Sequence, residues 1–313
     1  MRLRRVLLIA ICTLIANAGC AEGSSGLDWD VPDAPALGGQ STDAPIPAAQ
    51  TPEAQVPEAQ APGAQTMIGG SPNDAVTARA VAAAQAAGAA RGAYTAVALF
   101  DRHTGALYGA GDIDEPYASA SVMKVFIAAR LLAEGRAADP MVGDLMWRMI
   151  TLSDDDAATR LYQLVGAEDL VPWIARRYGV TGLAPSDQPG WWGLTRISAR
   201  AMVTFYAAVA ADPVVAPWLM EAMASTEPYA SDGFYQYFGL PAAAENWRVK
   251  QGWMCCLEGL SRMHSTGYID YDRYTVALLA AGPPSMYHEG DGAHALTAMA
   301  RALLPDGTVP KSV

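Results

Sequence analysis

Three strand-like segments follow one another near the C-terminal end of the chain, and they constrain its fold more than any other feature. They read NWRVKQGWMC (246–255), SRMHSTGYID (261–270) and RYTVALLAA (273–281), and only short turns separate them. Parallel neighbours need a connection of about a dozen residues or more, so these turns imply antiparallel neighbours. The segment YTAVALFDRHTGALYGAG (94–111) alternates around DRHTG and predicts a further hairpin.

Helical patterns fill the rest of the folded part. They cover residues 73–90, 121 to about 134, 140–151, 153–165, 167–178, 195–211, 213–225 and about 290–304. We therefore expect an α/β (α+β) domain over residues 71–313. It should hold a five-stranded antiparallel sheet flanked by helices, with a helical insertion at about 121–245.

The first 19 residues, MRLRRVLLIAICTLIANAG, predict a signal peptide. Three arginines precede an apolar run that is too short to span a bilayer. The stretch NAGC (17–20) resembles a lipobox, in which Cys20 would be lipidated and become the mature N-terminus, although Asn17 stands where Leu is usual. Lipidation would place the protein at the outer face of the cell membrane. The alternative is ordinary signal cleavage, with Cys20 incidental.

Residues 20–70 predict a disordered tether. The repeat TPEAQ, VPEAQ, APGAQ (51–65) is rich in Pro, Ala and Gln and has almost nothing to bury. An extended tether of ~50 residues at ~3.1 Å each could hold a domain well away from a membrane surface. A plain disordered leader would have the same composition, so the tether role depends on Cys20.

Charge and composition exclude some partners. The formal net charge is −11 and the chain has no run of Lys or Arg, so we expect no nucleic-acid partner. The run Asp154-Asp155-Asp156 is more typical of a helix N-terminus than of a metal site. We expect a monomer without metal or cofactor, whose partners are the membrane and a cell-wall peptide or small-molecule substrate.

The chain uses lysine sparingly, with 18 Arg and only three Lys. Two lysines precede the C-terminal tail, Lys124 and Lys250. Ser121 and Lys124 stand three residues apart on a predicted helix, so their side chains share a face. A serine needs a base to become a nucleophile, and a buried lysine can be that base, whereas arginine does not deprotonate. The alternative is a helix cap beside a solvated lysine.

Two further elements follow in order. MITLSDDDAATRLYQL (149–164) places Ser153 at the start of an amphipathic helix, where Asp154 is expected to order the first turn. WRVKQGWM (247–254) places Lys250 on the first late strand.

With Ser121-x-x-Lys124, this order resembles the serine β-lactamases and penicillin-recognising enzymes of the class A-like type, whose elements are S-x-x-K, S-D-N and K-T-G. The stretch VALFDRHTGALYGAGDIDEPYASASVMKVF is similar to the hairpin-plus-nucleophile region of class A enzymes. WIARRYG, GWWG, YQYFGLP and KQGWMCC resemble the alanine-rich, β-lactamase-like lipoproteins of mycobacteria.

The resemblance implies roles for six residues. Ser121 would be the nucleophile, and Lys124 would be its base or a proton relay. Ser153 would pass a proton toward the leaving group, and Lys250 would supply positive charge near the Ser153 hydroxyl and the substrate carboxylate. The N–H groups of Ser121 and Trp253 would form the oxyanion hole, and Gly252 would belong to the substrate site.

The chain departs from the class A pattern in ways that predict a poor β-lactamase. Asp155 replaces the S-D-N asparagine, so a carboxylate that only accepts hydrogen bonds faces the substrate. Gln251 replaces the threonine of K-T-G, next to Gly252. The deacylating E-x-x-x-N loop is absent, because Asp187 and Asp212 are the only acids between residues 170 and 220. The segment between the first two motifs is also short, so we expect a trimmed helical subdomain.

Other residues suggest sites less strongly. We expect Cys255 and Cys256 to be buried free thiols, with a vicinal disulfide as the alternative. His103 and His264 are expected at the surface or in the core. Several aromatic residues are expected either to line a cleft or to fill the core: Trp191, Trp192, Tyr235, Tyr237 and Phe238.

Two functions follow from these features. The first is a serine hydrolase or acyltransferase that acts on a cell-envelope peptide or ester. The second is a lipoprotein that keeps the fold and binds a ligand or partner without catalysis. The retained Ser and Lys residues favour the enzyme, and the departures at Asp155 and Gln251 favour the binding protein.

Overall fold

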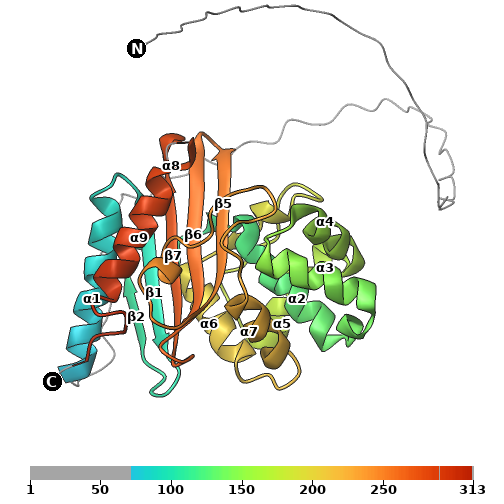
Figure 1. Ribbon diagram of the computed structural model, residues 1–313, viewed down its shortest axis with the longest axis horizontal. Coiled ribbons are helices and arrows are strands. Elements are labelled where there is room, and N and C mark those ends of the chain that lie inside the picture. Colours follow the sequence, from blue (N-terminus) through green and yellow to red (C-terminus); the bar gives the residue numbers. More distant parts are fainter. Residues whose placement is uncertain (1–71, 289, 312–313) are drawn as a thin grey trace, which may run out of the picture. The chain divides into compact units, whose positions relative to one another are not determined.

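The computed structural model describes residues 72–288 and 290–311 (Figure 1). The predicted signal peptide, Cys20 and the tether lie outside these residues. None of the helices that the structure describes is long and apolar enough to cross a membrane.

The centre of the domain is a five-stranded antiparallel sheet, which confirms the predicted fold class. Its strand order is β2-β1-β7-β6-β5, so the early hairpin joins the late meander through the β1–β7 pair. In the β5–β6 pair, Lys250 lies opposite Thr266 and Gly252 opposite His264. The strands are β1 (Tyr94–Asp101), β2 (Leu107–Ala110), β5 (Trp247–Leu257), β6 (Leu260–Ile269) and β7 (Tyr274–Gly282).

Helices cover both faces of this sheet. Figure 1 shows α1 (Pro72–Ala89) and α9 (Asp291–Leu303) side by side on one face. The helical insertion lies on the other face, with α6 (Ala199–Val209) packed on β1 and β7. The remaining helices of the insertion are α2 (Lys124–Ala133), α3 (Pro140–Thr151), α4 (Asp155–Leu164), α5 (Leu170–Tyr178) and α7 (Ala216–Ala224).

Short elements connect these helices and strands. The two-residue strands β3 (Tyr117–Ala118) and β4 (Arg196–Ile197) form a small second sheet. We predicted a helix from residue 195, but α6 begins at Ala199, after β4, where the side chain of Ser198 caps it. The remaining short elements are α8 (Ser285–His288) and the 3₁₀ segments η1 (Ala120–Met123), η2 (Arg136–Ala138), η3 (Ala167–Asp169), η4 (Trp192–Leu194) and η5 (Leu240–Ala242).

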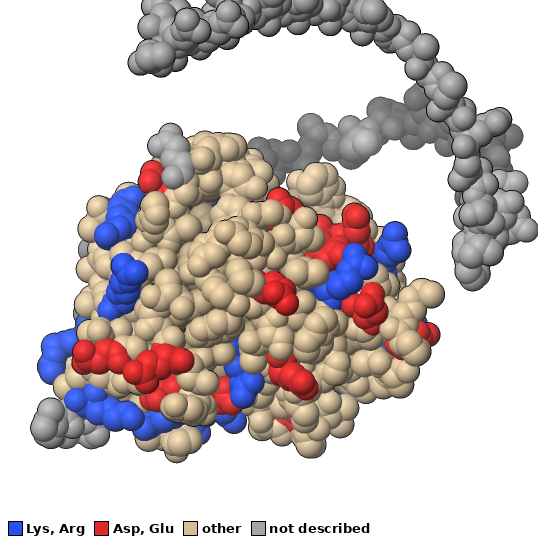
Figure 2. All heavy atoms as spheres, in the orientation of Figure 1, with Lys and Arg blue, Asp and Glu red and all other residues tan. Residues whose placement is uncertain are grey.

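Charged side chains are interspersed on the surface that Figure 2 shows. On this face of the described residues, Lys and Arg stand beside Asp and Glu and form no continuous basic area. This arrangement agrees with the absence of Lys/Arg runs in the sequence.

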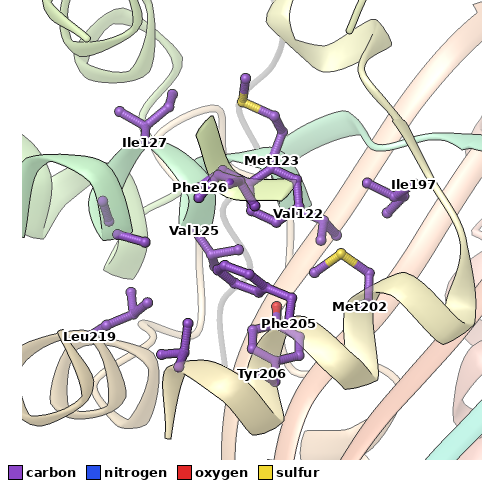
Figure 3. Close-up of a cluster of buried hydrophobic side chains, with 14 of the residues drawn as sticks. Val122, Met123, Val125, Phe126, Ile127, Ile197, Met202, Phe205, Tyr206 and Leu219 are labelled. Carbon is purple, nitrogen blue, oxygen red and sulfur yellow. The ribbon is translucent and has the colours of Figure 1, made fainter. Parts of the chain in front are cut away.

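The core holds the segment after Ser121 from all sides. Every residue of α2 from Lys124 to Ala129 is buried, and Figure 3 shows Val125 and Phe126 directed toward α6. The rings of Phe126 and Phe205 meet edge to face with their centroids 4.8 Å apart. A helix that is apolar around most of its circumference belongs in a protein interior. The position of Ser121 is therefore fixed by the packed core and not by a surface loop.

Candidate active site

Ser121 lies in η1, at the junction between β3 and α2. It is 6% exposed, and its N–H belongs to the first turn of a helix, where N–H groups have no partner inside the helix. Ala120, just before it, has a positive φ of 46°, which is uncommon for a residue with a side chain. Such backbone persists where surrounding contacts hold it, and it is frequent at active sites.

Lys124 connects the first two motifs. Its Nζ atom lies 2.8 Å from Oγ of Ser121, 2.6 Å from the carbonyl oxygen of Ser153 and 3.1 Å from Oγ of Ser153. A fourth contact joins it to Oδ1 of Asp155 at 2.5 Å. The side chain of Lys124 is completely buried, so its amine reaches these groups and no solvent.

Lys250 and Ser153 connect the second and third motifs. The Nζ atom of Lys250 lies 2.9 Å from Oγ of Ser153 and 3.1 Å from the carbonyl oxygen of Gln251. Ser153, like Ala120, has a positive φ, at 52°. The hydroxyl of Ser153 therefore bridges two buried amines, and the structure brings together Ser121, Lys124, Ser153 and Lys250 as one hydrogen-bonded chain.

Burial governs the protonation of both lysines. It lowers the pKa of Lys124, while the nearby carboxylate of Asp155 acts in the opposite direction. Burial also lowers the pKa of Lys250, and the positive charge of Lys124 lowers it further. A buried lysine with a lowered pKa can be neutral and accept a proton from a hydroxyl group.

Gly252 allows β5 to approach η1. A Cβ atom placed on this residue would lie 2.9 Å from the carbonyl oxygen of Ser119 and 3.2 Å from the backbone nitrogen of Val122. Both neighbours are backbone atoms, which cannot turn aside. The glycine therefore sets the distance between the strand that carries Lys250 and the segment that carries Ser121.

Two adjoining cavities open next to Ser121. The larger, of about 470 Å³, is lined by residues 189–194 together with Thr159. The smaller, of about 220 Å³, is lined by Asp232, Cys255 and Tyr287. Ser121, Asp155, Trp253 and Met254 line both.

The predicted aromatic residues divide between cavity and core. Trp191 and Trp192 line the larger cavity, and the Nζ atom of Lys124 lies 4.9 Å from the centre of a Trp192 ring. Phe238 is buried in the core that α1 and α9 share with the sheet. Tyr235 is half exposed, and Tyr237 packs on Trp247 with ring centroids 5.4 Å apart.

The three acids after Ser153 act separately. Asp154 accepts a hydrogen bond from the backbone N–H of Ala157 at 2.9 Å and pairs with Arg148, which confirms that it orders the start of α4. Asp155 contacts Lys124 and borders both cavities. Asp156 is exposed in the same turn.

Gln251, which replaces the threonine of K-T-G, is directed away from the two cavities. The side chain is buried, and its Nε2 donates hydrogen bonds to the carbonyl oxygens of Gln236 at 2.9 Å and Phe238 at 2.6 Å. Alternate side chains of a strand point to opposite faces, so Gln251 lies on the other face of β5 from Lys250. It fixes the loop around residues 236–238 and does not border either cavity.

Trp253 borders both cavities, and the residue is 8% exposed. The ring stacks on Phe234 with centroids 4.7 Å apart, and its Nε1 donates to Oδ2 of Asp232 at 3.0 Å. Sequence reasoning missed Asp232, because it lies in the loop before β5 and belongs to no motif. Asp187 is exposed and is not among the residues that line the two cavities.

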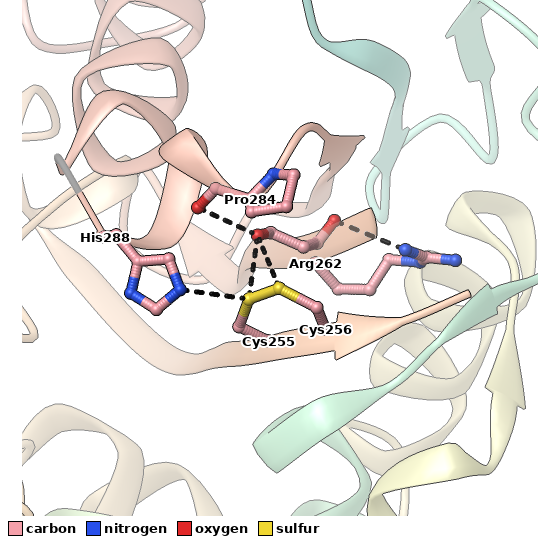
Figure 4. The surroundings of a disulfide bond; sticks show 6 residues. Cys255, Cys256, Arg262, Pro284 and His288 are labelled. Carbon is pink, nitrogen blue, oxygen red and sulfur yellow. Dashed lines mark hydrogen bonds between the residues drawn. A yellow bond between two sulfur atoms is a disulfide. The ribbon is translucent and has the colours of Figure 1, made fainter. Parts of the chain in front are cut away.

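The prediction of buried free thiols is wrong. Cys255 and Cys256 form a vicinal disulfide, Cys255 is partly buried and Cys256 is exposed. Figure 4 shows the pair beside His288, whose Nε2 lies 3.6 Å from Sγ of Cys255. Cys255 lines the smaller cavity, so this end of β5 lies at the surface and not in the core.

Among the described residues, this cysteine pair and His288 form a cluster that could hold a metal ion. The ligand atoms of Cys255, Cys256 and His288 lie within 4.8 Å of one another. Cysteine binds metals as thiolate, and the disulfide offers none. The two histidines that the sequence analysis named lie at the surface and in the core, as expected. His103 is exposed, and His264 is buried with its Nε2 2.9 Å from the carbonyl oxygen of Ala118.

Comparison with known proteins assigns the family. Residues 136–305 match the family described as the Beta-lactamase enzyme family. LppW of Mycobacterium tuberculosis (strain ATCC 25618 / H37Rv), which bears the name of a lipoprotein, is 35% identical over 233 residues, covering 71% of this chain and 73% of LppW. The chain belongs to the β-lactamase enzyme family. LppW of Mycobacterium bovis matches this β-lactamase family member to the same extent.

Solved structures of the β-lactamase family share the fold. A class A β-lactamase from Bacteroides cellulosilyticus has a TM-score of 0.60 at 13% identity, covering 74% of this chain and 97% of that enzyme. A class A β-lactamase from Mycobacterium abscessus has a TM-score of 0.56 at 16% identity, covering 72% of this chain and 99% of that enzyme. At these identities the likeness shows the fold alone, and the chemistry must be argued from the site.

Proposed function

We propose that this protein is an exported, lipid-anchored serine hydrolase or acyltransferase that acts through Ser121 on a peptide or ester of the cell envelope. The observation that carries the proposal is the 2.8 Å contact between Nζ of Lys124 and Oγ of Ser121, inside a buried site that lowers the pKa of that lysine. The name of LppW supports lipid anchoring, as do the apolar run and Cys20 in the sequence.

Acylation follows from this geometry. The Oγ atom of Ser121 forms a bond to the carbonyl carbon of the substrate while its proton passes to the neutral Nζ of Lys124. The N–H groups of Ser121 and Trp253 would stabilise the negative oxygen of the tetrahedral intermediate. When the bond to the leaving group breaks, that group takes up a proton through the hydroxyl of Ser153, which contacts both Lys124 and Lys250.

Release of the acyl group needs a second acceptor. Water would complete a hydrolysis, and an amine or alcohol would complete an acyl transfer. The loop that borders the cavity at residues 189–194 contributes no carboxylate to it, because Asp187 lies outside the lining. We therefore expect slow deacylation by water and a poor β-lactamase.

A second function has one observation in its favour. The carboxylate of Asp155 lies 2.5 Å from Nζ of Lys124 and favours the protonated form of that amine. If the ion pair kept Lys124 protonated, Ser121 would lack a base, and the cavity would bind a ligand without reacting with it.

Labelling with a fluorophosphonate probe separates the two functions. We expect one covalent adduct per chain, located on Ser121 by peptide mapping and absent in Ser121→Ala. Ser119→Ala is the matched control, because Ser119 is a buried serine two residues away that bonds to the backbone of Ala120 and Gly193. A folded wild-type protein that takes no adduct would leave the non-catalytic binding function.

A further inference from the structure

The cavities next to Ser121 carry charge of one sign. Among their lining residues the charged ones are Asp155 and Asp232, and both are exposed. The two lysines of the site are almost completely buried and do not appear in the lining. A ligand that enters therefore meets two carboxylates and no exposed cation from the lining residues.

The two carboxylates act on the same space. Oδ1 of Asp155 touches Lys124 at 2.5 Å from one side, and Oδ2 of Asp232 accepts from Nε1 of Trp253 at 3.0 Å from the other. Burial is the main cause that raises the pKa of Tyr287, and the negative charges of Asp232 and Asp155 raise it further. A carboxylate has about four acceptor positions, so each retains capacity toward the cavity.

Aromatic rings complete the wall. Trp253 and Tyr287 line the smaller cavity, and Trp191, which is 64% exposed, lines the larger one. Rings of this kind attract ammonium groups through their electron-rich faces. The two carboxylates and the exposed ring of Trp191 together suit a cationic group and disfavour a carboxylate.

We propose that the Ser121 cavity selects acyl donors that carry an ammonium group, held by Asp155 and Asp232. This inference rests on the proposed function and adds the substrate class. The ammonium also assists the chemistry. Asp155 favours protonated Lys124, so a cation that takes over part of the charge of Asp155 leaves Lys124 neutral and able to accept the proton of Ser121.

Three p-nitrophenyl esters of equal chain length test the selection: the hexanoate, the adipate half-ester and 6-(trimethylammonio)hexanoate. The trimethylammonium group cannot attack its own ester. We expect Ser121 to be acylated fastest by the cationic ester, by about fivefold over the neutral one, and slowest by the anionic one. High salt should reduce the difference, because salt screens exposed charges.

Variants identify the carboxylates. Asp155→Asn and Asp232→Asn should each reduce the ratio of cationic to neutral acylation, a ratio in which any change of general reactivity cancels. Asp156→Asn is the matched control, since it removes the same charge from the neighbouring residue outside the cavity lining and should leave the ratio unchanged. Equal rates for the cationic and neutral esters, or a ratio that Asp156→Asn reduces as much as Asp155→Asn, would overturn the proposal.

A binding measurement keeps this inference separate from the proposed function. In Ser121→Ala, which cannot be acylated, benzylammonium should quench tryptophan fluorescence more strongly than benzyl alcohol or phenylacetate, because Trp191 and Trp253 line the cavities. This result would support the cationic site even if no ester acylated the wild-type protein. No binding, or binding of all three compounds alike, would contradict the cationic site.

Discussion

The Nζ atom of Lys124 lies 2.5 Å from Oδ1 of Asp155, and the two side chains differ in exposure from 0% to 70%. Burial of the amine favours its neutral form, whereas the carboxylate favours its charged form, and burial is the larger cause. Asp155 stands where class A enzymes have an asparagine. The chain therefore places beside Lys124 a carboxylate that raises the pKa of the amine and so reduces the fraction of Lys124 that is neutral and able to accept a proton.

This pair predicts how acylation depends on pH. The acylation rate should rise with pH as Lys124 loses its proton, with a midpoint below the ordinary lysine value of 10.5. Asp155→Asn removes a carboxylate that raises the pKa of Lys124, so the midpoint should move to lower pH. The measurement is the rate of nitrophenolate release from the neutral ester over pH. A midpoint that stays in place or moves upward would show that Asp155 does not control Lys124.

His264 predicts a loss of stability in acid. Burial lowers its pKa from the ordinary value of 6.5 to about 4, and its Nδ1 has no hydrogen-bond partner within the described part of the chain. Between these values the unfolded chain binds more protons than the folded one, so the free energy of unfolding decreases as pH falls from 6.5 to 4. The contribution is about 3 kcal/mol.

Urea unfolding of the wild type and His264→Gln over this pH range tests that contribution. Glutamine can still donate to the carbonyl oxygen of Ala118 but does not titrate. The variant should therefore lose less stability in acid than the wild type. Parallel pH dependences of the two proteins would mean that His264 is not buried in its neutral form.

β-Lactams should not be turned over rapidly. Ser121, Lys124 and the N–H of Trp253 can support acylation, but Asp187 is exposed and outside the cavity lining. Incubation with penicillin should give either no reaction or a long-lived adduct on Ser121 in intact-mass spectra, with negligible hydrolysis of nitrocefin. Rapid, repeated turnover that Ser121→Ala abolishes would show that another group activates the water.

Lipid anchoring predicts a change of location. Cys20 lies outside the described residues, and its lipidation remains a prediction. Cys20→Ala should move the protein from the membrane fraction to the soluble exported fraction, because the variant lacks the thiol that would carry the lipid. A variant that stays membrane-bound, with an unchanged mass at the mature N-terminus, would disprove the anchor.

The sequence allowed most of the fold to be predicted because its elements have clear periods. The three late strands are strand-like runs linked by short turns, and the structure confirms that Asp154 caps α4. The two-residue strands β3 and β4 carry no period, and the four-residue helix α8 is too short for one. These elements could not be found from the sequence.

The candidate site was predictable only where a motif carries it. Ser121, Lys124, Ser153 and Lys250 lie together as their motifs imply. The position of Asp232 depends on the path of the loop before β5, and no sequence motif marks that loop.

Side-chain direction decided the remaining differences. Gln251 points to the opposite face of β5 from Lys250. Two adjacent cysteines in a sequence do not reveal whether their sulfur atoms are bonded, and in the structure Cys255 and Cys256 form a disulfide.

We expect neutral Lys124 to take the proton of Ser121, and Lys124→Arg tests this proton transfer most directly. Arginine keeps the positive charge and roughly the length of lysine but does not deprotonate. With circular dichroism to confirm that the variant is folded, the rate of fluorophosphonate labelling of Ser121 should fall by about a hundredfold or more, the usual contribution of a general base. Labelling of Lys124→Arg at the wild-type rate would contradict the account and leave Lys124 a structural residue.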